Sequence, residues 1–162
     1  MKIADKGKFM SLEQLYISPF RSKRSFDDNG QAYYVSLEVE IHPTGIYSVD
    51  YLLQALTNGE TLLKNVAKHL GCSGRDLSGL IHCLTGMPSE DFRMKYRQRL
   101  VDDLLRYTPL SLAEVAAHSG IGTERNLYNF CRRQFGCTPH ERRQRIRRLG
   151  DEGRFSLTDQ SL

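Results

Sequence analysis

Three side chains near position 130 have the types and the spacing needed to read DNA bases. Arg125, Asn129 and Arg132 follow one another at i, i+4 and i+7, which places them on one face of a helix. Leu127 and Cys131 fall on the opposite, apolar face. Arginine can donate two hydrogen bonds to guanine, asparagine can pair with adenine, and a helix fits the major groove. The pattern predicts a DNA-reading helix.

A weaker version of the same stripe lies about fifty residues earlier. Arg75, Gly79 and His82 share the outer face of a helix whose inner face carries Leu77 and Leu80. Glycine in a helix interior costs roughly 1 kcal/mol relative to alanine. Gly79 would repay that cost by letting the DNA backbone or a neighbouring helix approach closely. We expect this stripe to position the protein and the later stripe to supply most base readout.

The remaining candidates lie at the starts of the two helices, along their outer faces and in a basic run after the second. Positions 142–148 hold five arginines in seven residues. Phosphate contact and an ordinary solvated helix end explain this run equally well, since arginine is favourable at a helix C-terminus. The predicted DNA-contacting residues are Ser73, Arg75, Ser78, Gly79, His82, Thr123, Glu124, Arg125, Tyr128, Asn129, Arg132, Arg133, Arg142 and Arg143.

The elements that must hold these side chains form an internal repeat. Residues 66–71 return as 115–120, and Leu77 returns as Leu127. Each copy reads as a short helix, a turn and a longer helix that ends at a glycine, which is a helix-turn-helix unit. The expected first unit covers about 61–88, the second about 110–148, and together with a preceding helix they form a domain over 49–148.

One long helix, expected over about 89–107, joins the two units. About eighteen residues at 1.5 Å each span roughly 27 Å, and successive major grooves on one DNA face lie about 34 Å apart. One polypeptide could therefore place a recognition helix in each of two adjacent grooves. If the linker does not hold the units parallel, the DNA must bend or only one unit inserts.

The first 48 residues have a different character. Apolar and polar residues alternate from Tyr33 to Ile41, the period of a half-buried strand. Asn29-Gly30 suits a tight hairpin turn, with a partner strand within 15–26. A lone hairpin is marginally stable, so this segment must dock on the helical body or pair with another chain. It could be a clamp over the first unit, an element that docks a partner protein, or a dimerisation strand. Residues 15–42 are therefore a possible dimer contact.

Charge is distributed unevenly along the chain. The 162 residues carry a net charge of +4, but residues 62–148 alone hold sixteen Lys and Arg against eight Asp and Glu. A basic surplus on the repeat favours a phosphate-facing surface. The polar, acidic residues 149–162 are expected to be disordered. Since no stretch approaches the roughly 18 apolar residues of a membrane span, we expect a cytoplasmic protein with no membrane contact.

No chemistry-bearing constellation indicates an enzyme, a cofactor or a metal. The four cysteines show no CxxC pair and read as small apolar fillers rather than zinc ligands. No nucleophile–base pair, paired carboxylates or phosphate loop stands out. We therefore expect neither catalysis nor a bound cofactor.

These residues resemble the AraC/XylS family of bacterial transcription regulators. The resemblance is strongest from Leu110 to Ala116, at Gly120-Ile121 and from Phe135 to Pro139, and it extends back through the Arg97 to Leu105 pattern of the linker helix. It covers about 62–148. It implies a mainly α fold of two helix-turn-helix subdomains joined by a long linker helix, here preceded by a β-hairpin-like segment. It also implies a regulator that binds double-stranded DNA, with RNA polymerase as a possible further partner.

The chain departs from the family pattern at several positions. Gln98 stands where the linker normally has an apolar residue, and Arg142 replaces an aromatic residue, which predicts weak docking of the last helix. Forty-eight N-terminal residues are too few for the effector-binding barrel of many members, so the chain resembles the short, monomeric ones. The alternative is a degenerate member that binds another protein through its hairpin.

Overall fold

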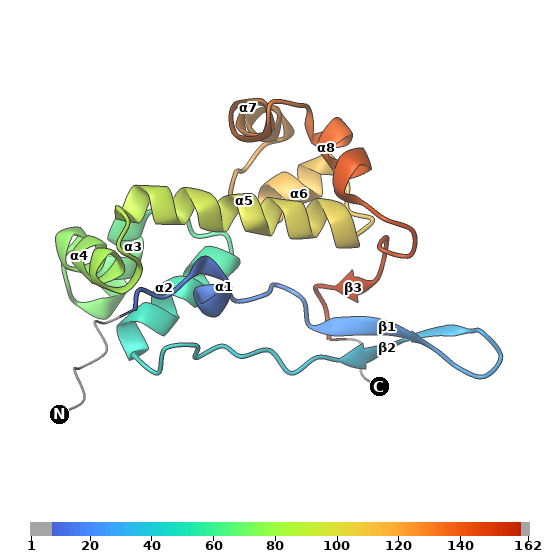
Figure 1. Cartoon of the computed structure of the whole chain (residues 1–162), viewed down its shortest axis with the longest axis horizontal. Helices are drawn as coiled ribbons and strands as arrows, with labels where there is room; N and C mark the ends of the chain where they lie inside the picture. Colours follow the sequence, from blue (N-terminus) through green and yellow to red (C-terminus); the bar gives the residue numbers. More distant parts are fainter. Residues whose placement is uncertain (1–7, 160–162) are drawn as a thin grey trace.

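The computed structural model describes residues 8–159, and the expected mainly α fold is confirmed (Figure 1). A short helix and two strands come first, the two helix-turn-helix units follow on either side of one long helix, and a short third strand closes the chain. The elements are α1 (Leu12–Leu15), β1 (Ser22–Phe26), β2 (Ala32–Ser36), α2 (Tyr47–Thr57), α3 (Leu63–Leu70), α4 (Gly74–Thr85), α5 (Ser89–Tyr107), α6 (Leu112–His118), α7 (Glu124–Phe135), α8 (Pro139–Ile146) and β3 (Phe155–Ser156).

Local hydrogen bonds set the limits of α4 and α7, the longer helices of the two units. The Ser73 hydroxyl accepts a hydrogen bond from the backbone N–H of Asp76, and the Asp76 carboxylate accepts one from the backbone N–H of Ser73. This capping box starts α4. Thr123 caps α7 in the same position without the reciprocal bond. Gly86 and Gly136 end these helices at φ of 73° and 69°, a left-handed conformation that glycine adopts without strain.

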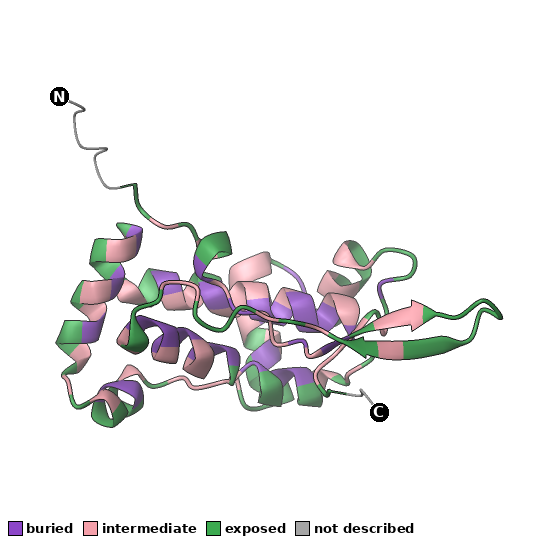
Figure 2. Cartoon of the chain, turned by 90° about the horizontal axis from the view of Figure 1, so that it is seen from below, coloured by how far each residue is buried: buried purple, intermediate pink, exposed green. Residues whose placement is uncertain are grey.

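Each unit has its own apolar core, and α5 contributes to both. Leu53, Val66 and Leu77 pack with Phe92 from the start of α5. The second core gathers Val101 and Leu104 from later in α5 with α6 and α7, including Val115, Leu127 and Cys131. Figure 2 shows buried residues along much of α5. The long helix is therefore the structural spine of both units.

The segment before β1 runs across both units as a strap. Ile17 is buried in the first core and Phe20 in the second. The Ile17 N–H donates to the Tyr96 hydroxyl over 3.0 Å, and the Thr57 hydroxyl donates to the Ile17 carbonyl over 2.7 Å. These buried bonds hold the strap to α5 and α2. The N-terminal residues therefore help to fix how the two units lie relative to each other.

The predicted hairpin forms, but it is shorter and more exposed than the sequence indicated. β1 pairs antiparallel with β2, with Phe26 opposite Ala32, and pairs with β3 on its other side. The predicted half-buried strand over 33–41 is wrong beyond Ser36. Tyr33 and Val35 are each 48% exposed, because β2 is the free edge of a small sheet that projects from the helices (Figure 1).

The prediction of a disordered tail is wrong for residues 149–159. β3 adds to β1, with Phe155 opposite Lys23, and the Phe155 ring stacks on Phe20 at 5.1 Å. Asp151 is only 2% exposed and accepts a 2.8 Å hydrogen bond from Arg106. Backbone pairing and ring packing outweigh the polar composition that favoured disorder. The final residues of that prediction, 160–162, lie outside the described part of the chain.

Candidate nucleic-acid interface

The outer face of α7 carries unengaged polar side chains. Arg125, Asn129 and Arg132 are all exposed, as their spacing predicted. Within residues 8–159, none of the three has a side-chain hydrogen bond or an ion pair, and neither does the exposed Arg133. The helix thus presents three cations and one amide whose donors are directed at solvent. Such a face is chemically equipped for base edges and phosphates.

The outer face of α4 is exposed but poorer in donors. Arg75, Gly79 and His82 all lie at the surface. A Cβ added to Gly79 would meet no described atom within 4 Å. The neighbouring-helix explanation of Gly79 is therefore excluded, and the glycine leaves open space above α4 that a DNA backbone can approach.

Several of the predicted contact residues have structural roles in the free protein. Ser73 and Thr123 accept backbone N–H bonds at 3.1 and 3.2 Å as helix caps. The half-buried Ser78 hydroxyl lies 3.1 Å from that of Ser89, which ties α4 to the start of α5. Glu124 is exposed in the first turn of α7, and Tyr128 is half-buried on its flank. These groups border the two outer stripes.

The prediction that Arg142 contacts DNA conflicts with its position in the fold. Its guanidinium donates two hydrogen bonds to the Asp102 carboxylate, at 2.9 and 2.7 Å, and lies 4.2 Å from the Phe135 ring centroid. The hydrogen bond to Asp102 raises the pKa of the Arg142 guanidinium. The expected weak docking of α8 is also wrong, because this fork replaces the aromatic residue with a bidentate bond and a cation–π contact.

Arg143 is likewise directed into the protein. It donates to the carbonyls of Leu105 and Leu110 at 3.0 and 2.6 Å. Arg147 adds bonds to the carbonyls of Leu105, Arg106 and Thr108. The last carbonyls of a helix lack partners within it, and these arginines supply donors there. Both guanidinium groups are thus occupied in the free protein, and a contact of either one with DNA would have to break these bonds.

The unusual Gln98 of the linker also has a structural role. Its amide donates a 2.7 Å hydrogen bond to the Gln134 side chain of α7. Together with the contact between Ser78 and Ser89, this means that α4 and α7 are both bonded to α5. Figure 1 shows α4 and α7 both nearly end-on, so their axes run close to parallel or antiparallel. Side-chain bonds to α5 therefore hold both helices in place.

A glycine–glycine contact joins the two units directly. A Cβ on Gly120 would collide with the Gly59 carbonyl, whose carbon lies 2.9 Å from the Cβ position. Gly59 follows α2, which packs in the core of the first unit, and Gly120 lies in the turn of the second. The corresponding Gly71 of the first unit has nothing within 4 Å. Only the second turn therefore serves as a joint.

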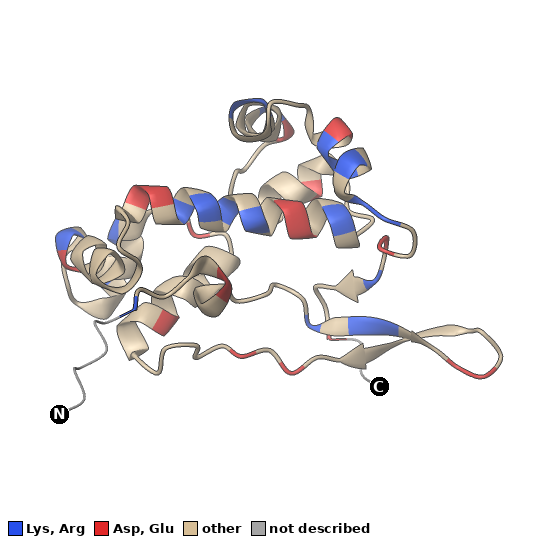
Figure 3. Ribbon diagram, in the orientation of Figure 1, with Lys and Arg blue, Asp and Glu red and all other residues tan. Residues whose placement is uncertain are grey.

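Positive charge is concentrated on the helices of the second unit, whereas the linker carries both signs. Figure 3 shows blue segments on α7 and α8 and both blue and red segments along α5. Burial and the nearby charge of Arg93 both lower the pKa of Arg97, as expected for cations held close together in partly dry surroundings. Within residues 8–159 no cluster of three or more His, Cys, Asp or Glu could hold a metal ion. None of the helices in that range has the length and apolarity to cross a membrane.

Comparison with known proteins agrees with this geometry. A family model described as a helix-turn-helix domain matches residues 66–145. Its AraC type, together with the two units on one linker helix, decides the family. The chain belongs to the AraC/XylS family. As an AraC-type protein it carries the helix-turn-helix domain of a DNA-binding transcription regulator. No curated protein matches the chain significantly.

Solved structures share the AraC-type fold at low sequence identity. The C-terminal domain of AraT, a response regulator from Geobacillus stearothermophilus, is 22% identical with a TM-score of 0.55, covering 71% of this chain and 90% of that one. The DNA-binding domain of AdpA, solved with a target DNA, is 23% identical with a TM-score of 0.52 over 60% and 90%. A similar domain is the C-terminal domain of the response regulator yesN from Fusobacterium nucleatum, 21% identical with a TM-score of 0.52 over 60% and 94%.

Proposed function

We propose that this AraC-type protein recognises a specific DNA sequence mainly through α7. The observation that carries the proposal is the difference between two sets of arginines. Arg142 and Arg143 of α8 are bonded inside the protein, whereas Arg125 and Arg132 of α7 are exposed without a described partner. Side chains kept free beside Asn129 can donate to guanine and adenine edges in a major groove.

The first unit has a positioning role in this proposal. Arg75 at the start of α4 can hold a phosphate, and the open space above Gly79 lets the DNA backbone come close. His82 adds a donor one turn further along. A helix N-terminus also favours negative charge. Such contacts set register and orientation on the duplex and carry no sequence information directly.

The linker sets the spacing between the two contacts. The 19 residues of α5 span about 28 Å at 1.5 Å each, and α4 is bonded to its start and α7 to its middle. These two attachment points lie closer together than the roughly 34 Å between successive major grooves. The bonds of α4 and α7 to α5 resist adjustment within the protein. The duplex therefore supplies the difference by bending toward it, as in other proteins that hold two grooves at once.

A selection from a random-sequence DNA library tests the proposal. The wild type should enrich a motif, and Arg125→Ala should lose preference at one base pair by about 1–3 kcal/mol. The matched control is Arg145→Ala, which removes another exposed arginine that the proposal assigns no base. If both variants kept the wild-type motif unchanged, α7 would not be the reading helix.

Salt dependence separates phosphate contacts from base contacts. Arg133→Ala should weaken binding to all sequences alike and lower the slope of log K against log salt by about 1. The absence of salt-sensitive DNA binding in the wild type would favour a protein-interaction module. Contact with RNA polymerase and pairing of chains through residues 15–42 stay predictions.

A further inference from the structure

A cavity lies where the N-terminal strap meets both helix-turn-helix units. It has a volume of about 200 Å³ and is lined by Pro19, Arg21, Thr57, Asn58, Leu104, His118 and Leu157. The strap, the end of α2, the last turn of α5, the end of α6 and the residue after β3 each contribute to its wall. None of the proposed DNA-contacting residues lines it. The cavity is therefore separate from the interface described above.

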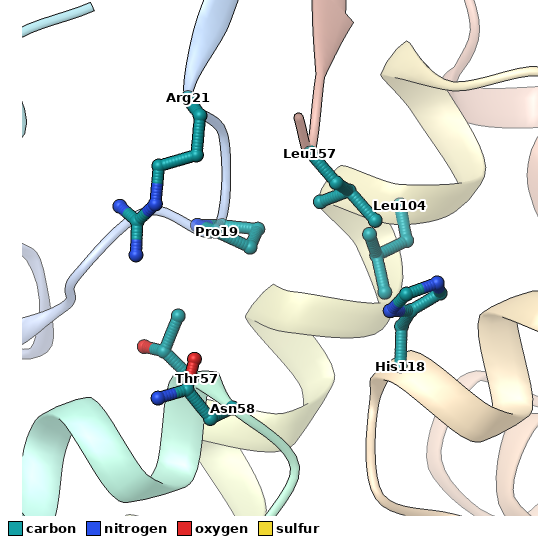
Figure 4. Close-up of a pocket in the computed structure, with 7 residues that line it drawn as sticks. All are labelled: Pro19, Arg21, Thr57, Asn58, Leu104, His118 and Leu157. Atoms are coloured by element: carbon teal, nitrogen blue, oxygen red, sulfur yellow. The ribbon is translucent and has the colours of Figure 1, made fainter. Parts of the chain in front are cut away.

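Arg21 gives this cavity its charge. Its backbone is held on both sides, since its N–H donates to Ser156 and its carbonyl accepts from Leu37, each at 2.8 Å. Its guanidinium has no hydrogen bond or ion pair with any of residues 8–159. Figure 4 shows it pointing toward Thr57 and Asn58 across the opening from Leu157, Leu104 and His118. A guanidinium without a partner, on a backbone held in place by hydrogen bonds, is suited to binding a carboxylate or phosphate.

The other polar groups around the opening agree with an anion. Asn58 and His118 can donate, and no Asp or Glu is among the lining residues. The carbonyls at the end of α2 already accept from backbone N–H groups of Asn58, Gly59 and Glu60. The Thr57 hydroxyl is engaged with Ile17 and Tyr96, so it forms a fixed wall. The side chains of Arg21, Asn58 and His118 therefore remain, and each of them can donate to an anion.

A second, more apolar cavity adjoins the first. Its volume is about 320 Å³, and it shares His118 and Leu157 with the first cavity. Pro109, Leu110 and Phe155 supply much of its lining. Small-molecule sites in proteins commonly combine an apolar wall with a few convergent polar groups. The two cavities together have that composition, with charge at one end and hydrocarbon at the other.

We propose that these adjoining cavities bind a small organic acid, with its carboxylate on Arg21 and its apolar part between Leu157 and Leu110. The ligand touches the strap and both units, so it stabilises their joint. A ligand that binds only the folded protein also raises its unfolding temperature. The proposal does not depend on the mode of DNA binding, because the two sites share no residue.

Isothermal titration of the full chain with hexanoate, acetate and hexylammonium tests the site. Hexanoate should bind at least tenfold tighter than acetate, and hexylammonium should show no saturable heat. Arg21→Gln should weaken hexanoate binding at least tenfold, with Arg21→Lys intermediate because it keeps the charge but loses the fork. Lys23→Gln, a neighbouring cation of β1 outside both cavities, should change the hexanoate Kd less than twofold.

Three results would overturn the proposal. They are no saturable hexanoate binding at millimolar concentration, an unchanged Kd in both Arg21 variants, and equal affinity for hexanoate and inorganic phosphate. The last would identify a simple anion site without an apolar part. Thermal unfolding of each variant without ligand shows that it is folded. A wild-type unfolding temperature that rises with hexanoate, but not in Arg21→Gln, would support the assignment by an independent readout.

Discussion

Replacing Gly120 by alanine tests whether the joint between the two units depends on a close backbone approach. Gly120 and its counterpart Gly71 have similar backbone angles, with φ of 78° and 69°. An alanine at either site pays about 1–2 kcal/mol for the left-handed conformation. Only at Gly120 would the new Cβ also collide with the Gly59 backbone. The pair of variants therefore isolates the contact from the strain.

The contact itself sets the expected difference. Overpacking of a well-packed site typically costs about 1–3 kcal/mol, and a backbone carbonyl yields less readily than a side chain. Gly120→Ala should thus lose about 1–3 kcal/mol more of unfolding free energy than Gly71→Ala. For a chain of this size that corresponds to an unfolding temperature about 2–12 °C lower.

Circular dichroism at 222 nm during heating and during urea titration would measure both variants against the wild type. The urea midpoint should fall further for Gly120→Ala while the slope stays constant. Equal shifts for the two alanines would refute the reasoning, because the collision would then contribute nothing to the joint.

Two further changes probe the last helix and the tail. Arg142→Ala removes the bidentate bond to Asp102 and should lower the unfolding free energy by about 1–2 kcal/mol. Hydrogen bonds to charged groups contribute about 1.5–3 kcal/mol, and this pair contributes less because it is partly exposed. The control Arg145→Ala should change the unfolding free energy by less than about 0.5 kcal/mol. Similar urea midpoints for the two variants would contradict the docking role. For Asp151, burial acts to raise the pKa, but the bonds from Arg106 and the Arg148 N–H leave it lowered. The carboxylate therefore stabilises the fold above the unfolded pKa of about 3.9, and this contribution is lost as pH falls through the folded pKa. Urea titrations between pH 5 and 3 should show that the unfolding free energy falls less steeply with decreasing pH in Asp151→Asn than in the wild type. An identical pH dependence in the two proteins would argue against this role of Asp151.

Local patterns predicted a large part of the fold and of the candidate site. The outward direction of Arg125 and Asn129 follows from the period of the helix and the burial of Leu127. The start of α4 is set by bonds between Ser73 and Asp76, only three residues apart. These features depend on interactions within one or two turns, and such interactions are legible in the spacing of residue types.

Other features depend on partners far away in the chain. Arg142 and Arg125 look alike in the sequence, and only the approach of Asp102, forty residues earlier, separates a docking arginine from a free one. The order of the tail likewise depends on β1, because Phe155 lies opposite Lys23 more than 130 residues away. Composition predicts only whether such residues are usually ordered or exposed. The partner of each one depends on which backbone strand or carboxylate the fold brings near it.

The repeat, its helical frame and the exposed outer face of α7 were therefore determined by sequence alone, because each rests on short-range periodicity and capping. The tertiary structure decided how the two units are joined. The strap through Ile17, the contact of Gly59 with Gly120 and the cavity beside Arg21 all arise from segments that meet only in the folded chain. Their physical cause is long-range packing, which no local pattern of residue types records.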